Sequence, residues 1–362
     1  MRLFKKNLVS ILIPTYNEEK NIVKLINDIE FHLKDIDYEI IVIDDKSRDK
    51  TAYKILELNS NKVKLIQREV DRGLIKSIKF GIQIVNGEFF VVMDGDGQHS
   101  AKDLRMIINE LNLGNELVIG IRNFKDITSS LSYFRKASSK FFNKLIKINL
   151  QIKIHDPLTG FFGAHVKILN RKFFQLDSSG FKVLLDLLFS IKNKKYVIKQ
   201  KYIEFLPRNH GISKLDLFNI FEFVSQMLSF LTQGIISPRV ISFLIVGLLG
   251  ATIHFSALFV FYYLLDVKFI LSQIISILFA NIFNFILNNL ITFSDYKYRG
   301  IDMIKGYIKY LLVNLVGIIA NIGSAGFIYS SFGSKAILAS SLGVIIEVVF
   351  KFSLSKSFVW RK

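Results

Sequence analysis

The sequence predicts an α/β domain with a mostly parallel sheet, followed by a helical membrane domain. Short β-branched or aromatic runs alternate with amphipathic segments over residues 9–119, the pattern of a parallel sheet covered by helices on both faces. Long apolar runs follow residue 239, and each is long enough to span a bilayer. Finally, 51% of the residues are apolar while the net charge is +18, a combination that is unusual for one soluble domain.

The composition limits the class of protein further. A length of 362 residues corresponds to two or three domains of about 150 residues each. The 34 phenylalanines exclude a disordered chain. Because cysteine is absent, disulfides, iron–sulfur clusters, thiolate zinc sites and cysteine nucleophiles are all excluded.

The alternating pattern places each element of the first domain. The expected strands are residues 9–13, 39–43, 63–66, 89–93 and 117–119, and the expected helices are residues 21–33, 52–58, 74–85 and 103–113. In such sheets, ligands bind at the carboxyl ends of the strands. Polar residues follow three of these strands, at 14–18, 44–47 and 94–96. The sequence therefore predicts a binding site at this edge of the sheet.

The segment Asp94-Gly95-Asp96-Gly97-Gln98 carries the strongest chemical signal. Two carboxylates one residue apart at a strand end can reach one hard cation, and Gln98 adds a third oxygen ligand. Such a cation would hold a diphosphate and stabilise the charge that develops as it leaves. The alternative is an ordinary polar turn, which is the usual meaning of an isolated Asp-x-Asp. The Val-Val-Met strand that precedes this segment favours the metal site.

Four long apolar runs predict transmembrane helices at residues 240–265, 269–293, 310–334 and 336–360. The first three runs contain no Asp, Glu, Lys or Arg, and the fourth is interrupted by Glu347, Lys351 and Lys356. Buried core helices are the alternative, which four consecutive runs of this length disfavour. Mutual pairing of Glu347 with Lys351, four residues later, is the simplest account of charges within the last span.

The basic residues between the spans indicate the orientation. The flank at Arg239, the link 297–309 and the tail are basic, whereas the links 266–268 and 331–335 carry one Lys each. The positive-inside rule places both termini, and with them the α/β domain, in the cytoplasm. Residues 239–362 hold 11 basic and 4 acidic residues, so +7 of the total +18 lies there and +11 on residues 1–238. With four spans attached, an anionic membrane surface rather than nucleic acid is the expected partner.

A connecting segment, residues 215–238, completes the predicted division into domains 1–214, 215–238 and 239–362. Its first part carries polar positions on one side, namely Asp216, Asn219, Glu222, Ser225 and Gln226. Such a helix can lie in the membrane interface and bring the site to lipid headgroups. The alternative is a helix that packs on the core of the α/β domain. Because the segment leads directly into the first span, the interfacial interpretation is favoured.

Seven motifs occur in order over residues 7–215. They are Pro-Thr-Tyr-Asn-Glu at 14–18, Asp-Asp-x-Ser-x-Asp-x-Thr at 44–51, Asp-x-Asp-x-Gln-His at 94–99, Gly-Ile-Arg at 120–122, Arg-x-x-x-Ser at 135–139, Asp-Pro-Leu-Thr-Gly-Phe at 156–161 and Arg-x-x-Gly-x-Ser-Lys at 208–214. Together they resemble the inverting glycosyltransferases of the GT-A fold. More narrowly, they resemble polyprenyl-phosphate sugar transferases of the dolichol-phosphate mannosyltransferase type.

This resemblance implies a nucleotide-sugar donor, a polyprenyl phosphate acceptor, bound Mn²⁺ or Mg²⁺, and a role for each matching residue. The donor's base and ribose would contact Pro14, Tyr16, Glu18, Ile43 and Asp45. The metal ligands would be Asp94, Asp96 and Gln98, and the backbone of Gly95 would also face the donor. The donor phosphates would be covered by Arg208 and Lys214. The acceptor phosphate would be held by Arg122, Arg135 and Ser139. The residues expected to act in catalysis are Asp96, Arg122 and Lys214.

The sequence departs from the family pattern in several places. These are Gly95, where Ala is frequent, Ser100, where Pro is frequent, Asp186, where Glu is common, and Phe205-Leu-Pro207 before Arg208. None of them removes an expected ligand, but Pro207 affects the loop expected to close over the donor. The histidines at positions 32, 99, 155, 165 and 210 lack metal-ligand spacing, so most are expected to be surface or structural residues.

The expected mechanism follows from the acceptor. A phosphate oxygen is already anionic near neutral pH, so the reaction needs little general-base help. Catalysis would rest on alignment for in-line attack at the anomeric carbon and on neutralising the departing nucleoside diphosphate. Inversion of the anomeric centre is implied by the resemblance.

The membrane part resembles GtrA-like membrane domains. The matching residues are Asn284-Phe-x-x-Asn288 with Thr292-Phe293, and Lys351-Phe-x-x-Ser355-x-x-Phe358-Val-Trp360. Asn281, Asn284 and Asn288 form one polar stripe on the second span. Hydrogen bonding between helices, worth about 0.6 kcal/mol a contact, is the expected role of this stripe. A path for lipid phosphate is the alternative.

Two classes of function remain. The first is an enzyme that moves a hexose from a nucleotide donor to a polyprenyl phosphate, with GDP-mannose and dolichyl phosphate preferred and UDP-glucose with a bacterial polyprenyl phosphate close behind. The second is a glycolipid flippase or transporter whose α/β domain only binds the sugar nucleotide. The complete Asp94, Asp96 and Gln98 set favours the enzyme. A processive polysaccharide synthase is disfavoured because its Gln-x-x-Arg-Trp motif is absent.

Overall fold

The computed structural model describes residues 4–70, 72–122, 150, 154–157, 159–176, 182–204, 217–331 and 355–360. The chain divides into two compact units, Met1–Ile235 and Ile236–Lys362. The strands of the first unit are β1 (Lys5–Thr15), β2 (Tyr38–Asp44), β3 (Val63–Gln67), β4 (Gly87–Val92), β5 (Leu117–Arg122), β6 (Phe162–His165) and β7 (Ile198–Ile203). Its α-helices are α1 (Ile22–His32), α2 (Thr51–Glu57), α3 (Leu74–Ile84), α4 (Ala101–Asn112), α6 (Arg171–Gln175), α7 (Val183–Ile191) and α8 (Leu217–Leu231).

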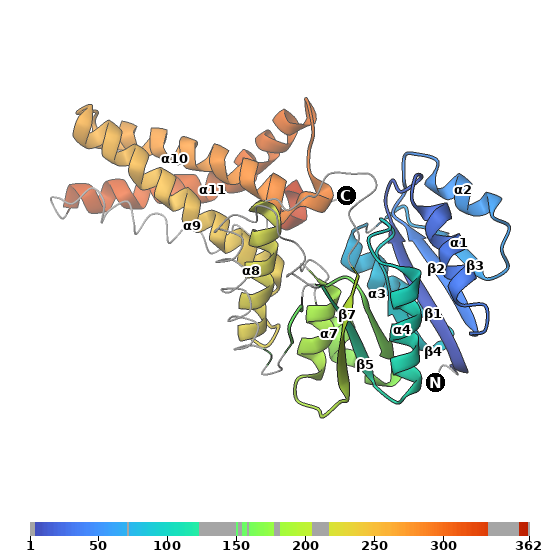
Figure 1. The fold of residues 1–362 in the computed structure, drawn as a ribbon. Coiled ribbons are helices and arrows are strands. Elements are labelled where there is room, and N and C mark those ends of the chain that lie inside the picture. The colour runs from blue at the N-terminus through green and yellow to red at the C-terminus, as the bar shows by residue number, and fades with distance from the viewer. Residues whose placement is uncertain are drawn as a thin grey trace. The chain divides into compact units, whose positions relative to one another are not determined.

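One seven-stranded sheet forms the frame of the first unit, in the order β3-β2-β1-β4-β6-β5-β7 (Figure 1). Neighbouring strands are parallel except at β6, which runs antiparallel to both β4 and β5. The predicted α/β fold with a mostly parallel sheet is therefore confirmed. The sequence did not predict β6 and β7, because β6 has only four residues and β7, an edge strand, has the sequence Ile-Lys-Gln-Lys-Tyr-Ile, whose second to fourth residues are polar.

The register of the central strands brings three loops to one edge. Thr15 pairs with Asp44 at the ends of β1 and β2, and Leu12 pairs with Val92 in β4. Because these strands are parallel, the segments after β1, β2 and β4 all emerge on the carboxyl side of the sheet.

The sheet has a hydrophobic core on each face because successive side chains of a strand point to opposite sides. In β1, Val9, Ile11 and Ile13 belong to a core shared with α1, α2 and α4. Leu12 belongs to the other core, which α3, α7 and α8 complete. Burial on both faces explains why β1, β2 and β4 are nearly continuous apolar runs in the sequence.

Helix α8 packs on the core of the first unit through one buried face, whose apolar side chains are Phe223, Met227 and Phe230. Ser225 and Gln226, which the sequence assigns to the polar side of an interfacial helix, are also buried. Gln226 Nε2 donates a hydrogen bond to Asp186 Oδ1 at 2.7 Å. The described face of α8 thus corresponds to the alternative interpretation, a helix packed on the domain core, and contact with a membrane stays a proposal.

The second unit contains long apolar helices. Within the described residues, two helical segments are long and apolar enough to cross a membrane, Pro238–Leu264 and Phe269–Thr292. They consist of α9 (Pro238–Leu258) and α10 (Phe269–Leu287), each continued by a π-helical turn, Phe259–Leu264 and Asn288–Thr292. Helix α11 (Asp302–Ser331) bends by 54° and would make a third span if the bent pair is counted as one. Most of the predicted fourth span, including Glu347 and Lys351, lies outside the described residues.

The polar stripe on the second span is buried within the helices of the second unit. Asn281, Asn284 and Asn288 are at most 8% exposed. A Cβ at Gly250 of α9 would lie 2.1 Å from Asn284 Oδ1, so this glycine permits the close approach of α9 and α10. Farther along α10, Gln273 Nε2 donates to Asn321 Oδ1 of α11 at 3.0 Å, which is the expected kind of hydrogen bond between helices.

The two GtrA-like motifs meet at one end of α10. The rings of Phe293 and Trp360 stack with centroids 4.2 Å apart, and Trp360 Nε1 donates to Asn289 Oδ1 at 3.3 Å. Both rings are almost completely buried. The aromatic residues of the two motifs therefore anchor the C-terminal segment Ser355–Val359 to the second unit.

Candidate active site

The loops after β1 and β2 are joined through Asp44. Its carboxylate accepts hydrogen bonds from Thr15 Oγ1 at 3.2 Å and from the backbone N–H of Ser47 at 2.9 Å, and the Ser47 hydroxyl donates to it as well. Asp44 is fully buried, so its lone pairs are directed into the protein. Asp44 thus stabilises the loops rather than presenting a charge at the sheet edge.

The rest of the Asp-Asp-x-Ser-x-Asp-x-Thr motif holds the loop after β1 by its backbone. The N–H groups of Asn17, Glu18 and Glu19 donate to the side chains of Ser47, Thr51 and Asp49, respectively, at 2.8, 2.8 and 3.2 Å. Burial raises the pKa of Asp49, but hydrogen bonds from Thr51 and Glu19 outweigh it, so this pKa lies below its ordinary value. An ionised acceptor strengthens these bonds, which fixes the position of the Pro14–Glu18 segment.

Asp45 organises the start of α3. Its carboxylate accepts hydrogen bonds from the N–H of Gly73 at 2.7 Å, from Ser77 Oγ at 2.7 Å and from Arg68 Nη1 at 3.1 Å. Gly73 has φ +132°, a backbone conformation that suits glycine. The side chain of Asp45 is therefore already engaged within the domain, and its expected contact with the donor stays a prediction.

The acidic segment lies directly after β4. A Cβ at Gly95 would approach Thr15 Cγ2 at 3.0 Å and the Pro14 carbonyl oxygen at 3.3 Å, so glycine suits this close contact with the end of β1. Asp96 is 9% exposed and accepts a hydrogen bond from the N–H of Gln98 at 3.1 Å. The acidic pair and the Pro14–Glu18 segment thus form one edge, as the sequence predicts.

The segment that leads into β6 packs against the acidic pair. A Cβ at Gly160 would lie 2.5 Å from Asp94 Oδ2, so the missing side chain provides the space that the Asp94 carboxylate occupies. Beside it, the His99 ring stacks on Phe161 with centroids 4.7 Å apart, and His99 Nε2 lies 3.7 Å from Asp94 Oδ2. The Asp-Pro-Leu-Thr-Gly-Phe motif therefore contributes directly to the position of Asp94.

Arg122, at the end of β5, forms a two-pronged ion pair with Asp156. Its Nε and Nη2 donate to the two carboxylate oxygens at 2.7 and 2.9 Å, and Asp156 is 3% exposed. Burial lowers the pKa of the guanidinium, but the hydrogen bonds and charge of Asp156 outweigh it and the charge of Asp94 adds to them, so the pKa is raised. Arg122 is thus a fixed cation within the electrostatic reach of Asp94.

The structure brings most of the predicted donor residues together, although it does not test their roles. Pro14, Tyr16, Glu18, Ile43 and Asp45 follow or end β1 and β2, and Asp94, Gly95, Asp96 and Gln98 follow β4. The Ile43 side chain belongs to the hydrophobic core, so only its backbone can face a ligand, whereas Tyr16 is 47% exposed. The expected residues Arg135, Ser139, Arg208 and Lys214 lie outside the described part of the chain.

The acidic pair fits a divalent cation that is shared with a substrate. Among the described residues, no group of three His, Cys, Asp or Glu side chains is arranged to hold a metal by itself. Mg²⁺ in nucleotide sites is usually held by one or two carboxylates together with substrate phosphates and water. Asp94 and Asp96 are the carboxylates available for such a cation at this edge, and Gly160 leaves room for the first of them.

Sequence reasoning missed the supporting residues of the site. Ser47, Asp49 and Thr51 hold the loop after β1, and Asp156 and Gly160 position Arg122 and Asp94. All five stand within motifs that the sequence displays. Their polar or small side chains at fixed motif positions could have indicated a structural role. The residues that they contact could not be predicted, because those residues are distant in sequence.

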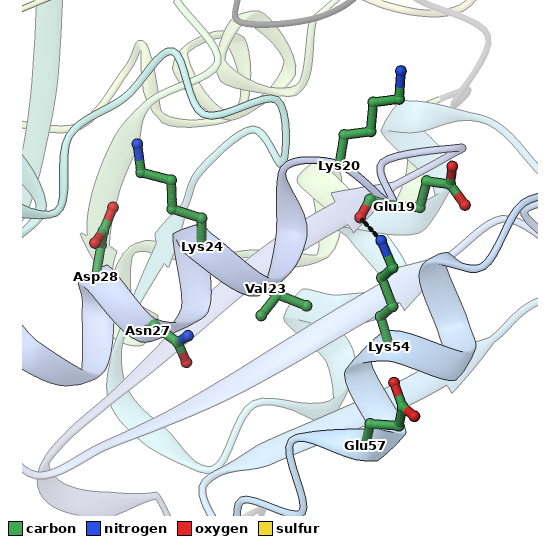
Figure 2. Close-up of a pocket in the computed structure, with 8 residues that line it drawn as sticks. All are labelled: Glu19, Lys20, Val23, Lys24, Asn27, Asp28, Lys54 and Glu57. Atoms are coloured by element: carbon green, nitrogen blue, oxygen red, sulfur yellow. Dashed lines mark hydrogen bonds between the residues drawn. The ribbon is translucent and has the colours of Figure 1, made fainter.

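A separate groove of about 630 Å³ lies between α1 and α2 (Figure 2). Its lining includes three lysines and three acidic residues, namely Lys20, Lys24, Lys54, Glu19, Asp28 and Glu57. Lys54 Nζ donates to the Glu19 carbonyl oxygen at 2.9 Å, as the dashed line in Figure 2 shows. The lining thus carries as many basic as acidic side chains.

The fold and the edge of the sheet define a class, namely glycosyltransferases built on a nucleotide-sugar-binding α/β domain. Residues 10–173 match glycosyl transferase family 2, and residues 242–360 match the GtrA/DPMS transmembrane domain. Over 356 residues the chain is 30% identical to the dolichol-phosphate mannosyltransferase of Pyrococcus furiosus, covering 97% of this chain and 99% of that relative. The chain therefore belongs to the dolichol-phosphate mannosyltransferase-type family of glycosyltransferases with a GtrA/DPMS membrane domain, as the motifs predict.

Other similarities concern parts of the chain. The putative glycosyltransferase CsbB of Bacillus subtilis is 34% identical over 156 residues, 42% of this chain and 47% of that relative. Among solved structures, glucosyl-3-phosphoglycerate synthase from Mycobacterium tuberculosis in complex with UDP aligns with a TM-score of 0.48 at 19% identity, covering 62% of this chain and 80% of that structure.

Proposed function

We propose that this protein transfers mannose from GDP-mannose to dolichyl or another polyprenyl phosphate, with inversion at the anomeric carbon. The observation that carries the proposal is the similarity to the Pyrococcus furiosus dolichol-phosphate mannosyltransferase over nearly the full length of both chains. The position of Asp94 and Asp96 at the carboxyl edge of the sheet supports it, because a transferred sugar leaves behind a nucleoside diphosphate whose charge must be stabilised.

The donor would lie along the edge formed by the Pro14–Glu18 segment and the acidic pair. Asp94, Asp96 and Gln98 are the proposed metal ligands, with Gly95 facing the donor through its backbone. Bound Mn²⁺ or Mg²⁺ would neutralise charge on the leaving diphosphate. The backbone hydrogen bonds that fix Asn17, Glu18 and Glu19 would give the donor a preorganised surface, and Arg208 and Lys214 are proposed to cover its phosphates.

The acceptor phosphate is assigned to Arg122, with Arg135 and Ser139. Asp156 accepts hydrogen bonds from two of the Arg122 nitrogens, and this fixes the orientation of the guanidinium group. A fixed cation suits a phosphate that has to attack in line, because alignment rather than proton removal limits such a reaction. In this role Arg122 binds the acceptor, while Asp156 acts as its positioning residue.

The active site is proposed to lie on the cytoplasmic side of the membrane. The basic residues at Arg239, in the link 297–309 and in the tail support this orientation. Polyprenyl phosphate presents its headgroup at the membrane surface, so the α/β domain, joined to the first membrane helix by a few residues, is within reach of it.

A screen of nucleotide sugars tests this proposal. Purified full-length protein would be incubated with dolichyl phosphate, Mn²⁺ or Mg²⁺, and one radiolabelled donor at a time, and labelled lipid would be extracted and counted. The proposal expects label in the lipid from GDP-mannose, removed by chelation of the metal. If only UDP-glucose labels the lipid, the proposed donor would be wrong, but the protein would still be a polyprenyl-phosphate glycosyltransferase. Flipping of glycolipid across vesicles without transfer from any donor would contradict the proposal and favour a transporter.

A further inference from the structure

Two lysines of the first unit share one buried aromatic ring, that of Phe189. Lys172 Nζ of α6 lies 4.3 Å from the centroid of the Phe189 ring, and Lys192 Nζ, just after α7, lies 4.5 Å from it. The Phe189 ring is fully buried and also stacks on Phe230 of α8, with centroids 4.2 Å apart. Both ammonium groups are therefore anchored to the same ring.

The two like charges lie close enough to oppose each other. Burial lowers the pKa of Lys192, and the charge of Lys172 lowers it further. In the described part of the chain, neither lysine forms an ion pair with a carboxylate. Arg171, Lys194 and Lys195 beside them are exposed, which adds to the positive potential. Neighbouring positive charges of this kind favour the binding of an anion from outside the domain.

The last turn of the first unit packs on the ring that these lysines share. The turn after α8 packs on the same ring: a Cβ at Gly234 would lie 3.0 Å from Leu176 Cδ2 and 4.0 Å from Phe189 Cε1. Helix α9 begins at Pro238, four residues after Gly234, which is at most about 14 Å of extended chain. The lysine pair is thus tied by a short connection to a helix long and apolar enough to cross a membrane.

Two exposed apolar side chains are sequence neighbours of Phe230 and Gly234, the residues that pack on the Phe189 ring. At the end of α8 and in the turn after it, Leu231 is 54% and Ile235 is 86% exposed, while Phe230 on the opposite side is buried in the core. Apolar residues beside basic ones, at the point where a chain enters a bilayer, are typical of a surface that contacts lipid headgroups and the upper part of the acyl region.

We propose that Lys172 and Lys192 form a binding site for the phosphate headgroup of an anionic phospholipid, with Leu231 and Ile235 contacting the adjoining acyl chains. The charge complementarity and the short connection to α9 favour a lipid as the occupant rather than an acidic protein. This site is separate from the catalytic edge: Lys172 lies on α6 and Lys192 directly after α7, and neither is in a segment that directly follows β1, β2 or β4. It would fix the height and orientation of the α/β domain at the membrane surface.

A lipid titration of the purified full-length protein tests the site. Dioctanoyl phosphatidylglycerol would be titrated into protein in a neutral detergent, and its Kd measured by microscale thermophoresis. Dioctanoyl phosphatidylcholine and inorganic phosphate would be titrated in parallel. At about fivefold in affinity for each lysine near an anionic headgroup, Lys172→Gln/Lys192→Gln should weaken phosphatidylglycerol binding about 25-fold. Lys172→Arg/Lys192→Arg keeps both charges, and because Lys and Arg contribute alike near an anionic headgroup, it should bind within about twofold of wild type.

The matched control is Lys194→Gln/Lys195→Gln, which removes the same charge from exposed neighbours of Lys192. It should change the Kd by less than about twofold, because among the described residues no aromatic ring lies under either ammonium group. If both glutamine double variants lose the same affinity for phosphatidylglycerol, binding depends on diffuse surface charge and the proposal is overturned. The proposal is also overturned if neither variant loses affinity. Inorganic phosphate or phosphatidylcholine binding as tightly as phosphatidylglycerol would also overturn it, because the site would then not distinguish an anionic lipid.

Discussion

Gly160→Ala is the sharpest test of how the acidic pair is positioned. The new Cβ would lie 2.5 Å from Asp94 Oδ2 and 2.9 Å from Oδ1, and ordinary contact begins at 3.4 Å, so the carboxylate would have to retreat by about 0.9 Å. The backbone of Gly160 is not in the left-handed region, so alanine adds no strain of its own. A displacement of about 1 Å in a positioned group can cost about 100-fold in rate, and transfer should fall by that order.

The assay is transfer of labelled sugar from the nucleotide donor to polyprenyl phosphate, measured while Mn²⁺ or Mg²⁺ is titrated. We expect the loss in kcat to come with a higher metal requirement. Gly114→Ala is the control, because Gly114 has φ +92° and nothing within 4 Å of an added Cβ. That variant should lose about 1–2 kcal/mol of stability to backbone strain but keep its metal requirement. Gly160→Ala with wild-type kcat and metal requirement would refute the proposed role of Asp94.

Three other changes test the described contacts. Arg122→Lys removes one of the two side-chain donors to buried Asp156, so thermal melts should show a loss of about 1–3 kcal/mol; an unchanged melt would contradict this. Asp186→Ala leaves Lys79, whose Nζ lies 2.8 Å from Asp186 Oδ2, buried without that partner, so urea unfolding should show a loss of about 3–5 kcal/mol. Burial lowers the pKa of His165 below its ordinary 6.5, although Glu88 opposes the shift. The folded state therefore favours neutral His165. The contribution of His165 to folding stability is present above pH 6.5 and is lost as the pH falls through the lower pKa of the folded state. Melting temperatures of His165→Gln should fall less on acidification, and an identical pH profile would contradict the assignment.

The sequence was sufficient for the frame of the first unit because its signals are local. The alternation of β-branched runs with amphipathic segments located β1 to β5 and α1 to α4 within a few residues, and parallel pairing then brought Pro14, Asp45 and Asp96 to one edge. Strand β6 was missed because a four-residue strand containing Gly163 has no period that distinguishes it from a loop.

Contacts between distant residues could not be predicted from one sequence. The space that Gly160 leaves for Asp94, and the pairing of Arg122 with Asp156, join residues 66 and 34 positions apart, and no local pattern encodes them. Helix α8 is a related case. Its polar positions indicate an interfacial helix, but Gln226 donates a hydrogen bond to Asp186 on α7, and Ser225 and Gln226 of the apparent polar side are buried.

The measurement that tests the central claim most directly is sugar transfer by Asp96→Ala. Purified wild type and variant would be given the nucleotide sugar, polyprenyl phosphate and Mn²⁺ or Mg²⁺, and labelled glycolipid would be counted, with membrane insertion followed in the same preparations. We predict that the variant inserts like wild type, since Asp96 lies at the carboxyl edge of the sheet in the first unit, and that transfer is abolished. Undiminished transfer by the correctly inserted variant would contradict the metal-assisted glycosyltransferase described above.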